Sequence, residues 1–529
     1  TADGKPYYYS HDQSLCRSLS FSYRFLSEKG LVRKLIAKLH HQNSYLDASS
    51  WTDFYRPNFD LVNSEMTLVY EGKHTKYRGQ ATKDNLFKLE LDSKKFQLGA
   101  LGQHILNLST MAMQRVNDTR NVDVEAPLAS DPLTGYTVRM GKVFKYGEPM
   151  GVFAQTYSFL NPITRFNWGV SLMDDIAFNE KLTMKLGARY DLFSTKDDRK
   201  GGAQNMGYID YLLRNMQGAA MNFDPINDKE SGFSFLGVVS YAHSQLLNAS
   251  YRFSTGFRVP NTEEKYFQFY SAWPSFIVLS NRDLKAEKSY NHELEFNGRG
   301  KGFGYLLSLY YNQYSDFIEL KQGTLAVKEP LMQAPKSISY VKNVNQTSAH
   351  LKGFDAALQL YPGEWVDLLK GFMVSSAFSY AEGSSSSGMS MLGIQPLTGN
   401  IGVEYTDPKA RWQVNIKANL YFAKPVSQTT FWDKDAAGKE LIRRYPASFM
   451  SNAYTFDAYG YYKVTRNFTV RLGIYNILNS EYLRWDDLRQ LTNPALLSNI
   501  NYFFQDGKKS LSRFSRPKRY ISLALEYKI

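Results

Sequence analysis

Length, composition and charge narrow the classes to which this protein can belong. The chain has 529 residues, of which 43% are hydrophobic and 15% aromatic, with one cysteine and a formal net charge of +13. A single cysteine excludes an intramolecular disulfide framework. Lysines and arginines are scattered along the chain and accompany no nucleic-acid-binding motif, so no nucleic-acid partner is expected. No stretch approaches the roughly 18 apolar residues that a membrane helix needs.

The N-terminal part of the chain predicts strands from about Leu15 onward. Their boundaries are hardest to assign in residues 15–155, and no separate globular unit can be recognised there. Length alone would allow roughly two to four domains. The strand pattern continues to the C-terminus, so we expect one domain spanning residues 1–529.

The connection at residues 195–230 predicts a short amphipathic helix ended by Pro225. Its apolar residues recur at helical spacing: Ile209, Leu212, Leu213, Met216, Ala220 and Phe223. Two interpretations stay open. The helix inserts into a groove on a partner protein, or it covers the end of this protein's own fold.

The second half of the chain contains segments with an apolar residue at every second position. In residues 412–422 the apolar positions are Trp412, Val414, Ile416, Ala418, Leu420 and Phe422. The same pattern occurs at residues 290–297, 354–360 and 468–474, and in the closing sequence YISLALEYKI. This periodicity predicts strands with one apolar face. Ten such residues, tilted near 45°, would cover about 25 Å of a membrane.

The predicted connections alternate between long and short from residue 195 to the C-terminus. A transmembrane β-barrel with tight periplasmic turns and long outer loops has this alternation, whereas a soluble sandwich has no reason for it. We therefore expect an all-β, antiparallel transmembrane barrel with about 18 to 20 readable strands. In such a barrel the C-terminus is periplasmic, and the last strand pairs with the first.

Several sequence motifs resemble those of TonB-dependent outer-membrane receptors. STGFRVPNTEEKYFQF (residues 254–269) and SNRDLKAEKSYNHELEF (residues 280–296) resemble that family's paired boxes. LGARYD, YNQYSDFIEL, YVKNVNQTSAHLKGFD and the C-terminal segment are similar to the same family in the same order. Two segments, FRVP…EKYFQF and YLRWDDLRQ, are most similar to the haemoglobin/haem branch of this family, which is related to transferrin and lactoferrin receptors.

The resemblance implies a 22-stranded barrel in the outer membrane of a Gram-negative bacterium, with an N-terminal plug in its lumen. No plug is recognisable in residues 1–155. The implied function is to bind haemoglobin or another host haem protein and to import haem with energy from the TonB complex. Implied surroundings are outer-membrane lipid and lipopolysaccharide, and the question of a lipoprotein co-receptor stays open. Haem would be cargo, not an intrinsic cofactor.

Candidate ligand residues lie between the two boxes. A haem site needs an axial ligand and an apolar or aromatic wall. This interval contains no histidine, so Tyr266 and Tyr270 are the candidate iron ligands, with Trp273 beside them. The alternative is that these aromatic residues pack on one another in a loop. Arg258 could pair with a haem propionate, or with Glu263 or Glu264.

Two further tryptophans, Trp432 and Trp485, are candidates for an exposed contact with a protein partner. Competing functions are a ferric-siderophore or transferrin/lactoferrin iron receptor of the same superfamily and, less compatible with the long aromatic loops, a passive porin. No nucleophile motif is recognisable, and no metal ligands are assigned beyond the two tyrosines. We therefore expect that this protein is not an enzyme.

Overall fold

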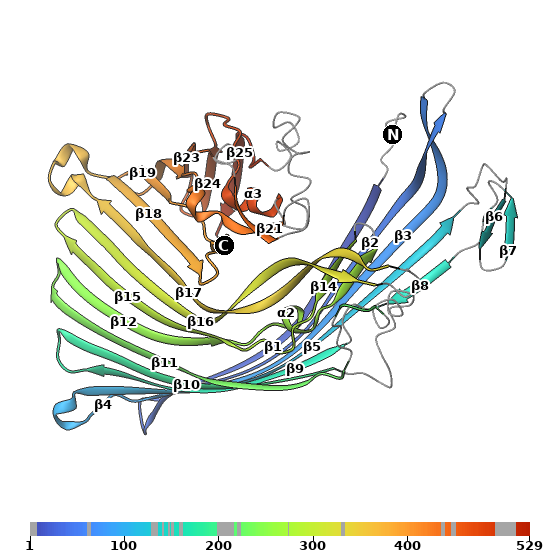
Figure 1. The fold of residues 1–529 in the computed structure, drawn as a ribbon. Helices are drawn as coiled ribbons and strands as arrows, with labels where there is room; N and C mark the ends of the chain where they lie inside the picture. The colour runs from blue at the N-terminus through green and yellow to red at the C-terminus, as the bar shows by residue number, and fades with distance from the viewer. Residues whose placement is uncertain are drawn as a thin grey trace.

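The structure is a computed structural model. It describes residues 8–60, 65–127, 136–139, 142–145, 149, 153–157, 162–197, 216–219, 224–272, 275–328, 334–434, 440–445, 451–491 and 515–528. Figure 1 shows a single large curved sheet, with short elements at both of its ends. Among the described residues, no helix combines the length and the apolarity needed to cross a bilayer.

The main sheet contains 21 strands in the described part of the chain. Seventeen of them form its wall, and each pairs antiparallel with the next wall strand along the chain. The wall strands are β1 (Tyr8–Leu26), β2 (Val32–Asp60), β3 (Glu65–Ser93), β5 (Gln103–Pro127), β9 (Ile163–Ala177), β10 (Leu182–Asp197), β11 (Asn227–Ser244), β12 (Leu247–Arg258), β15 (Glu287–Gly300), β16 (Phe303–Val327), β17 (Lys336–Leu360), β18 (Phe372–Ser385), β19 (Thr398–Thr406), β20 (Trp412–Tyr421), β23 (Ala453–Lys463), β24 (Phe468–Tyr475) and β25 (Tyr520–Tyr527).

Shorter elements lie in the connections. They are β4 (Phe96–Gln97), η1 (Gly99–Leu101), β6 (Tyr136–Arg139), β7 (Lys142–Lys145), β8 (Phe153–Tyr157), α2 (Thr262–Tyr266), β13 (Phe269–Ala272), β14 (Ser275–Leu279), η2 (Pro362–Glu364), η3 (Asp367–Leu369), η4 (Val426–Gln428), β21 (Thr430–Lys434), β22 (Glu440–Arg444) and α3 (Trp485–Leu491). Strand β14 pairs parallel with β17, whereas the other pairs are antiparallel.

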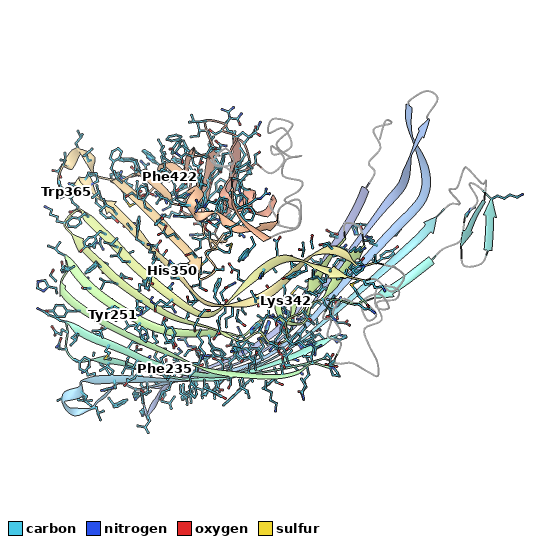
Figure 2. The ribbon with its side chains drawn as sticks, viewed as in Figure 1. Phe235, Tyr251, Lys342, His350, Trp365 and Phe422 are labelled. Carbon is cyan, nitrogen blue, oxygen red and sulfur yellow. The ribbon has the colours of Figure 1, made fainter. Side chains whose placement is uncertain are left out.

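The two faces of the wall differ in polarity, as the period-two pattern predicts. On β20, Val414 and Ile416 are 43% and 54% exposed, while Asn415 between them is 8% exposed and donates to Glu404 at 3.2 Å. Apolar side chains continue across register pairs on the same face, from Ile416 to Val403 and Ala458. Figure 2 shows side chains along both faces of the strands, with Phe235 among those on β11. One face of the sheet therefore suits lipid and the other suits water.

Short turns lie at one end of the wall, and long connections or extended hairpins lie at the other end. Short turns include residues 27–31, 178–181, 245–246, 301–302 and 464–467, and the connections between them are long or carry extended strands. The C-terminus lies at the short-turn end, because Lys528 N donates to Asn467 O at 2.9 Å. Trp365, 54% exposed, lies at the same end (Figure 2).

The prediction that the last strand pairs with the first is wrong. Within the described residues, β25 pairs only with β24, and β1 pairs only with β2. Strand number and barrel circumference are linked. Seventeen wall strands cover less of the circumference than the 22 that the family resemblance implies, so the two edges stay apart and the sheet is open in Figure 1.

The buried apolar clusters lie at the long-loop end, among the long connections and the ends of the wall strands that they join. One, which we call the Tyr270 cluster, contains Met216, Tyr270, Ile277, Val327 and Ile338. Another contains Phe431, Tyr445 and Trp485. The long-loop end is therefore a packed structure, although the serine-rich sequence of one of its loops, residues 383–393, predicts flexibility.

Candidate functional site

The FRVPNTEEKY segment ends β12 and forms α2, a single capped turn at the long-loop end. The Asn261 side chain accepts the Glu264 N–H at 2.7 Å, and the Glu264 carboxylate accepts the Asn261 N–H at 2.9 Å. This reciprocal capping box satisfies two otherwise unpaired backbone donors. The sequence therefore fixes the direction in which the chain leaves the wall.

Arg258 links this turn to the neighbouring strand. Its Nε donates to Glu287 at 2.5 Å, and its Nη1 donates to Glu264 at 2.8 Å. Of the pairings that the sequence left open for Arg258, the structure contains the ion pair with Glu264. Both carboxylates engage the guanidinium on this side of the loop, so a propionate would compete with two protein anions.

Lys265 and Tyr266 lie against the beginning of β11. The Lys265 ammonium contacts Asp228 at 3.0 Å and Glu230 at 2.9 Å, and its side chain is 7% exposed. The Tyr266 hydroxyl donates to Asp228, and the Arg282 guanidinium lies over the ring at 5.8 Å from its centroid. The loop therefore contains a compact network of charged and aromatic side chains.

The Tyr266 phenol is held in its neutral form. Burial, together with the hydrogen bond to Asp228, raises the pKa of Tyr266 well above its ordinary value. A ferric ligand would have to be the phenolate. Iron ligation by Tyr266 stays a prediction that requires the bond to Asp228 to open.

Tyr270 lies on β13 and is 1% exposed. Its ring packs in the apolar cluster with Ile277 and Ile338, and its hydroxyl accepts from Lys336 Nζ at 3.3 Å. The pairing of β14 with β17 positions this cluster, because it places the loop over the extension of the β16–β17 hairpin. In this arrangement a porphyrin could reach Tyr270 only after the loop moves.

Trp485 is buried, which differs from the expectation of an exposed partner contact. It is 4% exposed, and its Nε1 donates to Leu392 O at 2.7 Å. The Lys424 ammonium lies 5.4 Å from the ring centroid and donates to Ile394 O at 2.7 Å. These contacts join the β18–β19, β20–β23 and β24–β25 connections into one unit, which we call the Trp485 cluster, and which also contains Phe431 and Tyr445.

The other predicted partner residues have different surroundings. Met216 is 6% exposed and belongs to the Tyr270 cluster, so it is not presented to a partner. Trp432 is half-buried, with Lys321 Nζ at 5.7 Å from its ring centroid. Five predicted residues lie outside the described part of the chain: Ile209, Leu212, Leu213, Phe223 and Trp273.

The sequence did not indicate that Lys265 and Lys424 are buried, or that Lys265 pairs with the half-buried Asp228. Burial lowers the pKa of Lys424 to about 8. Local sequence could not indicate the contacts of Lys265 and Tyr266, because Glu230 lies 35 residues from Lys265 and Asp228 lies 38 residues from Tyr266. Among the described residues, no cluster of three histidine, cysteine, aspartate or glutamate side chains could hold a metal ion.

An antiparallel wall with one apolar and one polar face, tight turns at one end and packed loops at the other, is typical of the wall of an outer-membrane β-barrel protein. Residues 2–477 match the family model "TonB dependent receptor-like, beta-barrel". The chain belongs to this family of TonB-dependent receptors, whose members are outer-membrane transport receptors and not enzymes. No plug domain is identified among the described residues.

The curated relatives agree with this family. The chain is 26% identical over 398 residues to "Hemoglobin-binding protein A" of Haemophilus influenzae, covering 70% of this chain and 38% of that protein. It is 28% identical over 379 residues to "Hemoglobin-haptoglobin utilization protein B" of Neisseria meningitidis serogroup A, covering 66% and 42%. The chain thus spans about two fifths of the length of these relatives.

Solved structures show the same fold. "Copper transporter OprC" has a TM-score of 0.61 at 14% identity, covering 97% of this chain and 65% of that one. The ferric-catecholate import receptor Fiu of E. coli has a TM-score of 0.50 at 13% identity, covering 91% and 62%. At such identities the likeness concerns the fold alone.

Proposed function

We propose that the protein binds haemoglobin or another host haem protein through its long outer loops and imports the haem with energy supplied by the TonB complex. The observation that carries this proposal is the match of 70% of the chain to relatives named for haemoglobin binding. The long loops would face the outside, and the C-terminus, at the short-turn end, would be periplasmic.

The packed loops support a protein ligand over free haem. Tyr266 and Tyr270 are 7% and 1% exposed, and both hydroxyls are already engaged. A bare porphyrin would have to open a network to reach either oxygen. A haem protein can instead contact the outer surfaces of the Tyr270 and Trp485 clusters, which present a preformed shape. Haem release would then follow docking.

The polar face of the wall supports passage through a wet lumen. Arg115 pairs with Asp84 at 2.8 Å through two donors, and Arg189 pairs with Asp191 in the same way. Paired charges on one face are typical of a water-filled or plugged interior and unsuited to a lipid face. Contact with TonB would be made through a plug domain, and outer-membrane lipopolysaccharide would surround the wall. Whether a lipoprotein co-receptor assists is a further question for the binding assay.

The test measures binding of purified protein to immobilised haemoglobin, to haem alone, to transferrin and to a ferric siderophore. We expect saturable binding to haemoglobin, and growth on haemoglobin as the iron source that requires TonB. Binding to transferrin or to the siderophore without binding to haemoglobin would replace this proposal with the iron-receptor alternative. Energy-independent conductance would indicate a porin.

A further inference from the structure

On the apolar face of the wall, the side chains of strands β15 to β18 change from apolar to polar between one row of register partners and the next row on the same face. One row across these strands is Leu294, Leu309, Phe354 and Tyr380. The next row on this face, toward the long loops, is His292, Tyr311, Lys352 and Glu382. The edge of the apolar band therefore lies between these two rows.

The opposite edge of the band is marked by aromatic rings at the short-turn end. Phe372 and Tyr405 have ring centroids 4.8 Å apart, and Tyr405 and Trp412 are 5.0 Å apart. The ten residue steps on β18 from Phe372 to Glu382, at about 3.3 Å each and a 45° tilt, span about 23 Å. This agrees with the roughly 25 Å height of the apolar band of an outer-membrane barrel. The row of Lys352 thus lies at the level of outer-leaflet headgroups, given the orientation in the proposed function.

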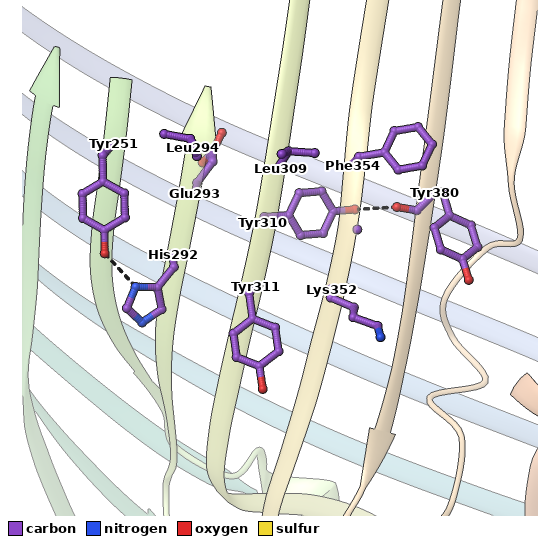
Figure 3. Close-up of a pocket in the computed structure, with 11 residues that line it drawn as sticks. Tyr251, His292, Glu293, Leu294, Leu309, Tyr310, Tyr311, Lys352, Phe354 and Tyr380 are labelled. Carbon is purple, nitrogen blue, oxygen red and sulfur yellow. Dashed lines mark hydrogen bonds between the residues drawn. The ribbon is translucent and has the colours of Figure 1, made fainter. Parts of the chain in front are cut away.

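A concavity of about 430 Å³ spans this boundary. Figure 3 shows the residues that line it, which come from β12, β15, β16, β17 and β18. The part of the concavity nearer the middle of the bilayer is lined by the apolar side chains of Leu294, Leu309 and Phe354. Glu293, Tyr310 and Gly353, at the alternating positions, also line it, and the Tyr310 hydroxyl donates to Tyr380 O at 3.3 Å.

The rim of the concavity presents hydrogen-bond donors. Lys352 Nζ contacts Glu382 at 3.0 Å, yet its side chain is 56% exposed. The other Glu382 oxygen already accepts from the Tyr380 hydroxyl at 2.8 Å and from Gln428 at 2.7 Å. That carboxylate is occupied by protein donors, so Lys352 keeps further N–H groups for an acceptor outside the protein. The Tyr311 hydroxyl accepts from Gln313 at 3.5 Å and can still donate its own proton. Figure 3 shows the Tyr311 and Lys352 side chains on neighbouring strands.

We propose that this concavity binds one phosphorylated lipid of the outer leaflet. An acyl chain lies along Leu294, Leu309 and Phe354, and the phosphate contacts Lys352 and Tyr311. The apolar wall continues into the lipid-facing surface, and the ammonium at the rim complements an anionic headgroup. The proposal rests on the outer-membrane placement and not on the identity of the cargo.

The test uses protein extracted in mild detergent, stripped of lipid and mixed with bisphosphorylated lipid A, and counts bound lipid by native mass spectrometry. We expect one retained lipid, and about fivefold weaker retention for Lys352→Gln, since one lysine near a membrane surface contributes about 1 kcal/mol. Leu309→Trp fills the concavity and should also reduce retention. Lys417→Gln is the matched control, because Lys417 follows Ile416 and lies on the opposite face.

Folding of each variant is checked by its heat-modifiable migration on gels, and Tyr311→Phe gives a third variant if one of the others fails to fold. Equal retention by wild type, Lys352→Gln and Leu309→Trp would overturn the proposal, as would displacement of the lipid by inorganic phosphate. Haemoglobin binding is measured on the same samples. If the wild type retains the lipid but does not bind haemoglobin, only the proposed function is contradicted. If the wild type binds haemoglobin but retains no more lipid than Lys352→Gln and Leu309→Trp, only this inference is contradicted.

Discussion

Arg258 and Glu287 occupy directly opposed positions in the ladder between β12 and β15, and the guanidinium Nε donates to the carboxylate at 2.5 Å. The other Glu287 oxygen accepts the backbone N–H of Ile318 on β16 at 2.7 Å. Glu287 is 8% exposed. One buried carboxylate thus joins the capped turn α2 to two neighbouring strands.

Replacing Arg258 by alanine should loosen the loop that contains α2. The substitution leaves Glu287 without its cationic partner, and we expect a loss of about 1 to 2 kcal/mol, at the low end because the arginine is half-exposed. Hydrogen exchange of residues 261–267 should become faster. Arg411→Ala, which removes an exposed pair with Asp407, is the control and should leave that exchange unchanged. Equal exchange in Arg258→Ala and wild type would contradict this role.

Tyr266→Phe should leave the visible spectrum of any bound haem unchanged. The Tyr266 hydroxyl donates to Asp228, and its raised pKa keeps it protonated, so it is a poor candidate for an iron ligand in this conformation. We expect a modest destabilisation of about 1 kcal/mol from the lost hydrogen bond. The measurement compares Soret absorption of the variant and the wild type with haem. A shifted Soret band would assign Tyr266 to the iron.

The Trp485 cluster should tighten as pH rises from about 8 to above 10. Burial lowers the pKa of Lys424 to about 8, whereas its ordinary value is 10.5. Between these values the opened cluster binds more protons than the closed one, so the closed form gains stability with pH. Quenching of Trp485 fluorescence by iodide should fall over this window. Lys424→Met should remove the pH dependence, and a wild type without any pH dependence would refute the assignment.

Ile416→Arg should strongly impair insertion into lipid. Ile416 is 54% exposed on the apolar face of β20, where an arginine near the middle of the bilayer costs about 2 to 4 kcal/mol. Lys417→Arg, at the next position on the opposite face, should insert normally. Folding into vesicles, followed by heat-modifiable migration, measures both. Comparable folding yields would mean that this face does not meet lipid.

The alternation of apolar and polar residues predicted the wall strands well. This pattern depends on which side of the sheet each residue faces, and not on which strand lies beside it. Residues 412–422 were expected to form a one-sided apolar strand, and Val414 and Ile416 are exposed on one face of β20. The alternation of turn lengths holds for most of the predicted range, but β16 and β17 are joined by residues 328–335 alone, because the strands themselves extend through most of the predicted loop. The regularity of β25 carried no information about its second neighbour, so the predicted closure with β1 was wrong.

The surroundings of the loop residues could not be predicted, since their partners are distant in sequence. Trp485 is buried through Leu392, 93 residues away, and Tyr266 donates to Asp228, 38 residues away. An aromatic residue in a loop has the same local pattern whether it is exposed or packed. Arg258 was the exception, because its partner Glu264 lies within one helical turn of the cap.

The hairpin of β16 and β17 continues far past the polar row that contains Tyr311 and Lys352. The sixteen residue steps from Tyr311 to Val327, the last residue of β16, correspond to about 37 Å of height at a 45° tilt. A cargo first captured at the tip would therefore be separated from the bilayer by a distance similar to the diameter of a small globular protein. Capture of the cargo and its entry into the barrel would therefore take place at different sites. A substitution at the tip of the hairpin would abolish docking without affecting later transfer of the cargo through the barrel.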